Sequence, residues 1–172
     1  ALLMSGTEDE VFLKKEVNIY NAINNILERW NPLLQKKLIT VEPIEVNGDE
    51  AKCVCNISEI DIIIVLNNFL LNSADFLEKA SVDVRRINVS ITEKTDRIIV
   101  DLENNGPPLN GIFESNPDKI FDAGVSTKIM KNGKKGSGIG LWISQMIVHD
   151  NSGSIRVLEK NNGFGIRISL PK

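Results

Sequence analysis

Glycines occupy every second position from Gly136 to Gly140, directly before an apolar stretch with helical spacing. Glycine lets the backbone approach a ligand closely, and the first turn of a helix offers N–H groups without partners and a partial positive charge. This arrangement suits an anion such as a phosphate group. Many loops share the pattern, so its meaning depends on the motifs that precede it.

Asparagines provide the next candidate ligands, at Asn68 and Asn72 inside an otherwise apolar run. Four residues apart on a helix, the two side chains share one face, and Asp75 and Phe76 follow on that side. An amide oxygen can hold Mg²⁺, which needs few protein ligands because it retains several waters. The plainer alternative is a pair of solvated amides. The opposite, apolar stripe can pack against a sheet, and it consists of Ile63, Leu66, Leu70 and Leu77.

Two polar segments separate these motifs. Residues 104–109 have the sequence Asn-Asn-Gly-Pro-Pro-Leu, and residues 120–128 have the sequence Ile-Phe-Asp-Ala-Gly-Val-Ser-Thr-Lys. Asn-Gly and Pro are also common in turns that merely end a strand. The whole stretch 104–136 is polar and lacks periodicity, which is typical of a functional or mobile loop. No Gly-Lys-Ser/Thr follows at Walker A spacing, and no βαβ unit indicates a dinucleotide fold.

In this order the four segments resemble the N, G1, F and G2 boxes of the ATP-binding catalytic domain of sensor histidine kinases. That domain belongs to the GHKL superfamily and has the Bergerat fold. The resemblance covers the chain from about Glu16 to its end. It implies ATP and Mg²⁺ as cofactors, and a protein-histidine kinase that donates the γ-phosphate to a histidine on a separate dimerisation domain. The implied partners are that phosphoacceptor domain of the same protein and the receiver domain of a response regulator.

The resemblance also implies roles for single residues. Asn72 would bind the metal, and Phe76 would lie beside the adenine. Asn104 stands where the family has an Asp that accepts a hydrogen bond from the adenine amino group. The candidate catalytic residues are Asn68, Asn72 and Lys128. The candidate nucleotide-binding residues are Asn72, Phe76, Asn104, Gly106, Thr127, Lys128, Gly136, Ser137, Gly138, Ile139, Gly140 and Leu141.

Several positions depart from the family pattern. Asn104 is neutral, and Pro108 replaces a second glycine, so we expect weaker affinity or relaxed base selectivity. At Asp75 the family often has a basic residue near the phosphates. Related ATPases of the Hsp90, gyrase and mismatch-repair type carry a Glu general base where this chain has Asn68. An amide cannot take a proton, so hydrolysis is expected to be secondary.

The remaining pattern predicts an α+β fold, a two-layer sandwich of a mixed sheet with helices packed on one face and a mobile ATP lid. A helix is expected from Glu16 to about Lys37, in which Pro32 marks the end or a kink. Ser58 is the expected N-cap of a second helix. The other expected elements are strands at 38–41, 52–57, 87–91, 97–102, 154–159 and 165–170, and a third, core-packed helix at 139–149.

The chain of 172 residues suits one domain at 13–172, preceded by a tail at 1–12 that the resemblance interprets as a remnant of the dimerisation helices. Because the chain begins without Met, we expect it to be part of a longer protein. A net charge of -3 argues against nucleic-acid binding, and no apolar run approaches the roughly 20 residues that span a bilayer. Cys53 and Cys55, two apart in a strand, are expected to be buried and structural and not to bind a metal. Because they are expected to stay reduced, the sequence favours a cytoplasmic location.

The only histidine, His149, is expected at a helix C-terminus, where a cation is favoured. It lies on the wrong element to be the phosphoacceptor. Two alternatives stay open. One is a catalytically degenerate nucleotide-binding or interaction module, and the other is an Hsp90-like ATPase.

Overall fold

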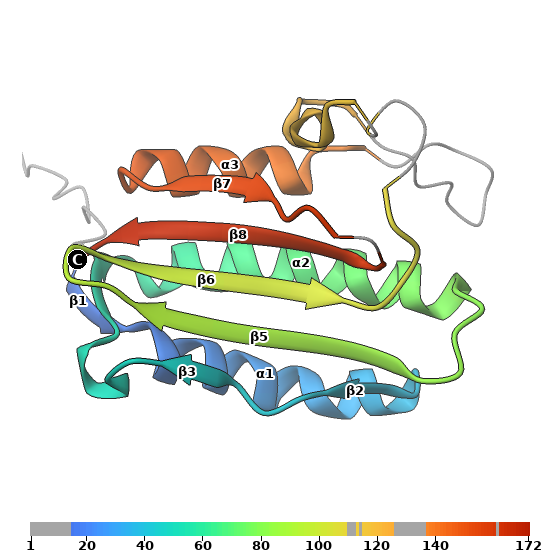
Figure 1. Cartoon of the computed structure of the whole chain (residues 1–172), viewed down its shortest axis with the longest axis horizontal. Coiled ribbons are helices and arrows are strands. Elements are labelled where there is room, and N and C mark those ends of the chain that lie inside the picture. Colours follow the sequence, from blue (N-terminus) through green and yellow to red (C-terminus); the bar gives the residue numbers. More distant parts are fainter. Residues whose placement is uncertain (1–14, 110–112, 114, 126–136, 161) are drawn as a thin grey trace, which may run out of the picture.

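The computed structural model describes residues 15–109, 113, 115–125, 137–160 and 162–172. Within this part of the chain, a six-stranded mixed sheet forms one layer and three helices form the other (Figure 1). The strands of the sheet are β2 (Ile39–Val41), β3 (Glu45–Asn47), β5 (Arg85–Glu93), β6 (Arg97–Asn104), β7 (Ser154–Val157) and β8 (Phe164–Pro171). The helices are α1 (Ile19–Lys36), α2 (Glu59–Lys79) and α3 (Gly140–Asp150). The predicted α+β sandwich is confirmed, whereas residues 110–112, 114 and 126–136 of the expected lid lie outside the described residues.

The strand order is β2-β5-β6-β8-β7, and β3 also pairs with β5. The four strands β5, β6, β8 and β7 are antiparallel, while β2 and β3 run parallel to β5. Strand β3 was missed, because Asn47 and Gly48 indicate only a turn, which does follow at Gly48 with a φ of 119°. Strand β6 ends at the same side of the molecule as the C-terminal half of α2 and the start of α3 (Figure 1).

An ion pair fixes the register of the central strands β6 and β8. Arg167 donates two hydrogen bonds, of 2.7 and 2.6 Å, to the carboxylate of Asp101, which lies directly opposite it. This bidentate geometry is the strong form of the Arg–carboxylate contact, and the hydrogen bonds raise the pKa of Arg167 further above its ordinary value. The pair therefore holds in place the end of β6, where Asn104 lies.

Helix α2 is the central helix of the layer. Ser58 caps it as predicted, since its side chain accepts a hydrogen bond from the backbone N–H of Ile60. Its apolar length also suits a membrane-crossing helix, which corrects the expectation that no apolar segment approaches that length. Packing between the sheet, α1 and α3 accounts for this composition. Its buried residues are Ile62, Val65, Leu66, Phe69, Leu70, Ser73, Ala74 and Leu77.

The beginning of the described chain differs from the prediction. Residues Lys15–Asn18 form a strand, β1, that pairs antiparallel with β4 (Val54–Ile57), and α1 starts only at Ile19. The side chain of Asn18 caps α1 by accepting from Asn21 N–H at 2.9 Å, which sets this boundary. The helix does not end at Pro32 but continues to Lys36, because Leu34 beyond it is fully buried in the core.

Cys53 and Cys55 are both free and buried, as their spacing predicts. Strand β4 begins one residue after Cys53, which instead ends the short 3₁₀ helix η1 (Glu50–Lys52). Burial raises the pKa of Cys55 to about 11, with a smaller contribution from Cys53. Both thiols therefore stay protonated near neutral pH and act as core side chains.

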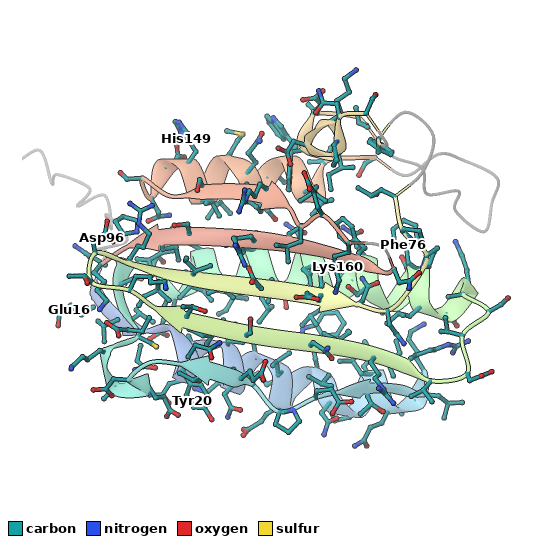
Figure 2. The ribbon with its side chains drawn as sticks, viewed as in Figure 1. Glu16, Tyr20, Phe76, Asp96, His149 and Lys160 are labelled. Atoms are coloured by element: carbon teal, nitrogen blue, oxygen red, sulfur yellow. The ribbon has the colours of Figure 1, made fainter. Side chains whose placement is uncertain are left out.

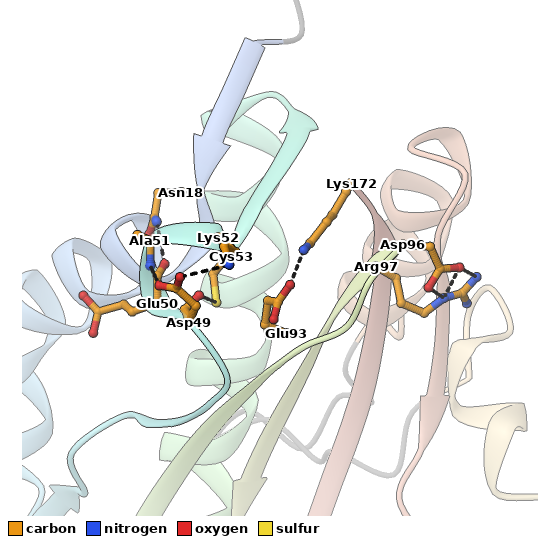
Figure 3. A network of polar contacts seen from close by, with 10 residues as sticks. All are labelled: Asn18, Asp49, Glu50, Ala51, Lys52, Cys53, Glu93, Asp96, Arg97 and Lys172. Carbon is orange, nitrogen blue, oxygen red and sulfur yellow. Dashed lines mark hydrogen bonds and ion pairs between the residues drawn. The ribbon is translucent and has the colours of Figure 1, made fainter.

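Polar contacts hold together the end of the molecule where the chain terminates (Figure 3). Asn18 donates to the carbonyl of Glu50 at 2.9 Å, which joins the start of α1 to η1. Lys172 pairs with Glu93, and its backbone N–H donates to the carbonyl of Asp96 at 3.1 Å. These contacts anchor the last strand at the end away from Asn104.

Candidate functional site

Helix α2 places the predicted ligands on one side. Asn68, Asn72 and Asp75 are half-buried, and Phe76 is 37% exposed near the end of the helix. Of the apolar stripe predicted opposite them, Leu66, Leu70 and Leu77 are buried, but Ile63 only partly. The amides therefore line the side of α2 that does not face the sheet core.

Asn68 contacts the start of α3. Its side-chain nitrogen donates to the carbonyl oxygen of Gly140 at 2.9 Å and to the hydroxyl of Ser144 at 3.2 Å. The Ser144 hydroxyl in turn donates to the same carbonyl at 3.1 Å and is fully buried. The structure thus joins the first asparagine of the N box to the last glycine of the glycine-rich segment.

Asn104 is buried at the end of β6 and has its amide orientation set by two neighbours. Its oxygen accepts from the backbone N–H of Gly106 at 3.0 Å, and its nitrogen donates to the hydroxyl of Ser73 at 3.0 Å. A backbone N–H can only donate, so the oxygen must face Gly106. A carbonyl oxygen has a second lone pair, which the hydrogen bond from Gly106 does not use.

Asn105, the next residue, anchors this turn to β5. Its side chain accepts from Arg86 N–H at 2.7 Å and donates to the carbonyl of Val84 at 2.6 Å. The turn after β6 is therefore held from both sides, since Asn104 bonds to α2 and Asn105 to the start of β5.

Glycines are required where backbone segments meet. Gly138 has a φ of 63°, and a Cβ there would lie 2.4 Å from the carbonyl oxygen of Val125. Gly163 has a φ of 81°, and a Cβ there would lie 2.2 Å from the carbonyl oxygen of Asn104. No side chain fits at either position, so these glycines let the glycine-rich segment and the β7–β8 connection approach their neighbours.

Buried aromatic side chains pack in the core next to the segments that carry the site residues. Phe121, the expected F-box residue, is fully buried in the 3₁₀ helix η3 (Pro117–Phe121), and Phe113 is buried as well. Phe69 of α2 stacks on Phe164 of β8 with 6.5 Å between ring centroids. Of the four apolar residues predicted to pack α3 in the core, Trp142, Ile143 and Ile147 are half-buried, but Met146 is 45% exposed.

The structure therefore brings Asn68 to Gly140, and Asn104 to Gly106. Ser137, Gly138, Ile139 and Leu141 are described beside them, whereas Thr127, Lys128 and Gly136 lie outside the described residues. Three residues that contact Asn68 or Asn104 were not predicted from the sequence, namely Ser73, Ser144 and Gly163. Signals for them existed, because Ser73 follows Asn72 directly, Ser144 interrupts an apolar helix, and Gly163 ends an Asn-Asn-Gly turn.

The donor set fits a hard cation bound through few protein ligands. Within the described part of the chain, no group of three or more His, Cys, Asp or Glu side chains could hold a metal. A magnesium ion at Asn72 would therefore depend on the amide oxygen, on water and on oxygens of its ligand. This is the way Mg²⁺ usually binds with nucleotides.

A sandwich with polar amides on its central helix and a glycine-rich segment at the next helix defines a nucleotide-binding class of site. Comparison with known families identifies it further. Residues 57–172 match the family of histidine kinase-, DNA gyrase B- and HSP90-like ATPases. The chain belongs to this family, and ATP is the nucleotide that membership implies.

Individual proteins agree with this assignment. A probable C4-dicarboxylate sensor kinase of Halalkalibacterium halodurans is 34% identical over 65% of this chain and 20% of its own length. The catalytic domain of the histidine kinase ThkA has a similar fold, with a TM-score of 0.73 and 23% identity over 92% of this chain and 97% of its own. ThkA in complex with the response regulator TrrA matches with a TM-score of 0.73 and 21% identity, over 92% of this chain and 41% of that one. The chain spans about a fifth of the length of the first curated relatives it matches.

Proposed function

We propose that this chain is the ATP-binding catalytic domain of a sensor histidine kinase. It binds Mg-ATP and donates the γ-phosphate to a histidine on a separate dimerisation domain of the same protein. A response regulator then receives the phosphate. The observation that carries the proposal is the contact of Asn68 with Gly140, because it brings two family motifs, 72 residues apart, to one place.

Each part of the site has a task in this proposal. Asn72 holds Mg²⁺, which neutralises charge on the phosphates. Asn104 offers its oxygen to the adenine amino group, and Phe76 lies beside the base. The backbone N–H groups of the glycine-rich segment, together with Thr127 and Lys128, bind the phosphates. Transfer of this kind needs positioning and charge stabilisation more than covalent chemistry by the protein.

Hydrolysis of the Hsp90 type is the less favoured function. Asn68 occupies the place of the general base in the related ATPases, and its nitrogen donates to Gly140 and Ser144. An amide cannot act as a general base, and this one donates its N–H groups to the protein. His149 is exposed at the far end of α3, toward the opposite end of the molecule from Phe76 (Figure 2). The phosphoacceptor is therefore sought on a separate domain, in a cytoplasmic part of a larger protein.

Calorimetric titration of the chain with Mg²⁺ and a non-hydrolysable ATP analogue tests the nucleotide site. The wild type should bind in the micromolar range only with Mg²⁺, and this binding should collapse in Asn72→Ala. Adding a dimerisation domain in trans with labelled ATP should then produce phosphohistidine. No binding by the folded wild type would contradict the proposal and favour a degenerate interaction module, whereas steady hydrolysis by the isolated chain would favour the ATPase.

A further inference from the structure

The contact between α2 and α3 uses the donor side of Asn68. The side-chain nitrogen lies 2.9 Å from the carbonyl oxygen of Gly140 and 3.2 Å from the hydroxyl oxygen of Ser144. Ser144 is fully buried and Asn68 is half-buried, so these hydrogen bonds are partly shielded from competition by water. The amide is thus engaged with the protein itself.

Gly140 is suited to this contact because it has no side chain. A Cβ at position 140 would lie 3.2 Å from the side-chain oxygen of Asn68, closer than an ordinary packing contact. Glycine therefore allows the two helices to approach until the amide reaches the carbonyl. The glycine is explained by helix contact as well as by its place in the phosphate-binding motif.

The contact fixes the direction of the first turn of α3. The first N–H of the helix with a partner four residues back is that of Ile143, which donates to Ile139 at 2.8 Å. The N–H groups just before it have no such partner within the helix and can bind an anion. Their orientation relative to Asn72, one turn further along α2, is determined by how Gly140 is held.

We propose that Asn68 and Ser144 are positioning residues that hold the start of α3 against α2. They align the phosphate-binding N–H groups of α3 with the metal ligand Asn72. The inference rests on the proposed nucleotide site, and it assigns Asn68 a role through Gly140, in place of direct contact with the reacting atoms.

The test compares substitutions of Asn68 by titration with the Mg-ATP analogue. Asn68→Ala should raise Kd about five- to tenfold, the effect of one or two lost hydrogen bonds. Asn68→Asp should weaken binding at least as much, because its carboxylate would face the carbonyl of Gly140. If the Asn68→Asp variant binds the analogue as tightly as the wild type, the proposal is overturned, because a hydrogen-bond acceptor at position 68 would then suffice.

Two further readouts separate positioning from general damage. Adenosine, followed by NMR, should bind the wild type and Asn68→Ala equally, because it has no phosphate. Asn68→Ala should keep Mg²⁺-dependent binding of the ATP analogue at a raised Kd, whereas Asn72→Ala should lose this binding. Equal weakening for adenosine and the ATP analogue would overturn the proposal.

The matched control is Asn67→Ala, which removes the neighbouring amide, bonded to Trp30 at 2.7 Å outside the site. It should leave nucleotide affinity unchanged. Ser144→Ala is the milder variant, and its effect should not add to that of Asn68→Ala, because the two residues share one carbonyl. Strict additivity would count against the proposal. If the folded wild type itself fails to bind, the proposed function fails first, whereas wild-type binding with a neutral Asn68→Ala refutes only the positioning role.

Discussion

Asn104 presents a neutral amide at a position where related domains carry a charged carboxylate, and two neighbours decide how that amide faces. The N–H of Gly106 fixes the oxygen, and Ser73 takes the nitrogen. An unconstrained Asn could turn either a donor or an acceptor toward a base. Here only the acceptor orientation satisfies Gly106, and under the proposed function this orientation suits the amino group of adenine.

Asn104→Asp should therefore tighten binding of the ATP analogue. Hydrogen bonds to a carboxylate are stronger than bonds to a neutral amide, and both Gly106 N–H and the Ser73 hydroxyl can donate to the new side chain. We expect Kd to fall by about three- to tenfold, measured by calorimetry. Unchanged or weaker binding, with an unchanged melting temperature, would show that Asn104 does not face the base.

Ser73→Ala should destabilise the fold, because it leaves the nitrogen of the buried Asn104 without this partner. An unsatisfied buried group costs about 1–3 kcal/mol, which urea denaturation would measure as a lower free energy of unfolding. Ser154→Ala, at the exposed start of β7, is the matched control and should change stability by less than about 0.5 kcal/mol. A loss equally small for Ser73→Ala would contradict the hydrogen bond.

At the scale of elements, the helices and central strands were predictable, since their periodicity and the Ser58 cap are local signals. Elements that depend on distant partners were not. Strand β1 forms because β4 pairs with it, and β3 because β5 does. In the same way, the contact of Asn68 with Gly140 could not be predicted, because the motifs give the two residues but not the helix packing that joins them.

Pro32 is an element-scale test, because it lies exposed inside α1. Proline supplies no N–H to the carbonyl four residues earlier, at Glu28, and costs about 3 kcal/mol in a helix interior relative to alanine. Pro32→Ala should therefore stabilise the protein. The greater freedom of the unfolded chain reduces the gain to about 1–2 kcal/mol. A higher urea midpoint would confirm it, whereas Pro43→Ala, in the β2–β3 connection, should not raise the midpoint.

At the scale of the whole molecule, one core joins all three helices to the sheet, so stability and the site are linked. Buried side chains of α2 and the central strands belong to a single cluster. Within the described chain, the site lies where β6 ends, and the C-terminal contacts of Lys172 lie at the other end of the sheet (Figures 1 and 3). Strand β4 pairs with β1 and contains none of the site residues. Global stability can therefore be altered at β4 without changing the site residues.

The buried thiol of Cys55 predicts how global stability depends on pH. Its pKa of about 11 in the folded protein exceeds the value of about 8.5 for an exposed thiol, because burial disfavours the thiolate. The unfolded chain therefore loses this proton first as pH rises. The stabilising contribution is complete below about pH 8 and declines until pH passes the folded value of about 11.

We expect this thiol to account for a loss of about 2–3 kcal/mol in the free energy of unfolding between pH 8 and pH 11. Other side chains can also alter stability in this range, so the measurement is the difference between the wild type and Cys55→Ala, from urea denaturation across this range. The wild type should lose more stability than the variant. Parallel curves for the two proteins would mean that the thiolate forms as readily in the folded core as in the unfolded chain.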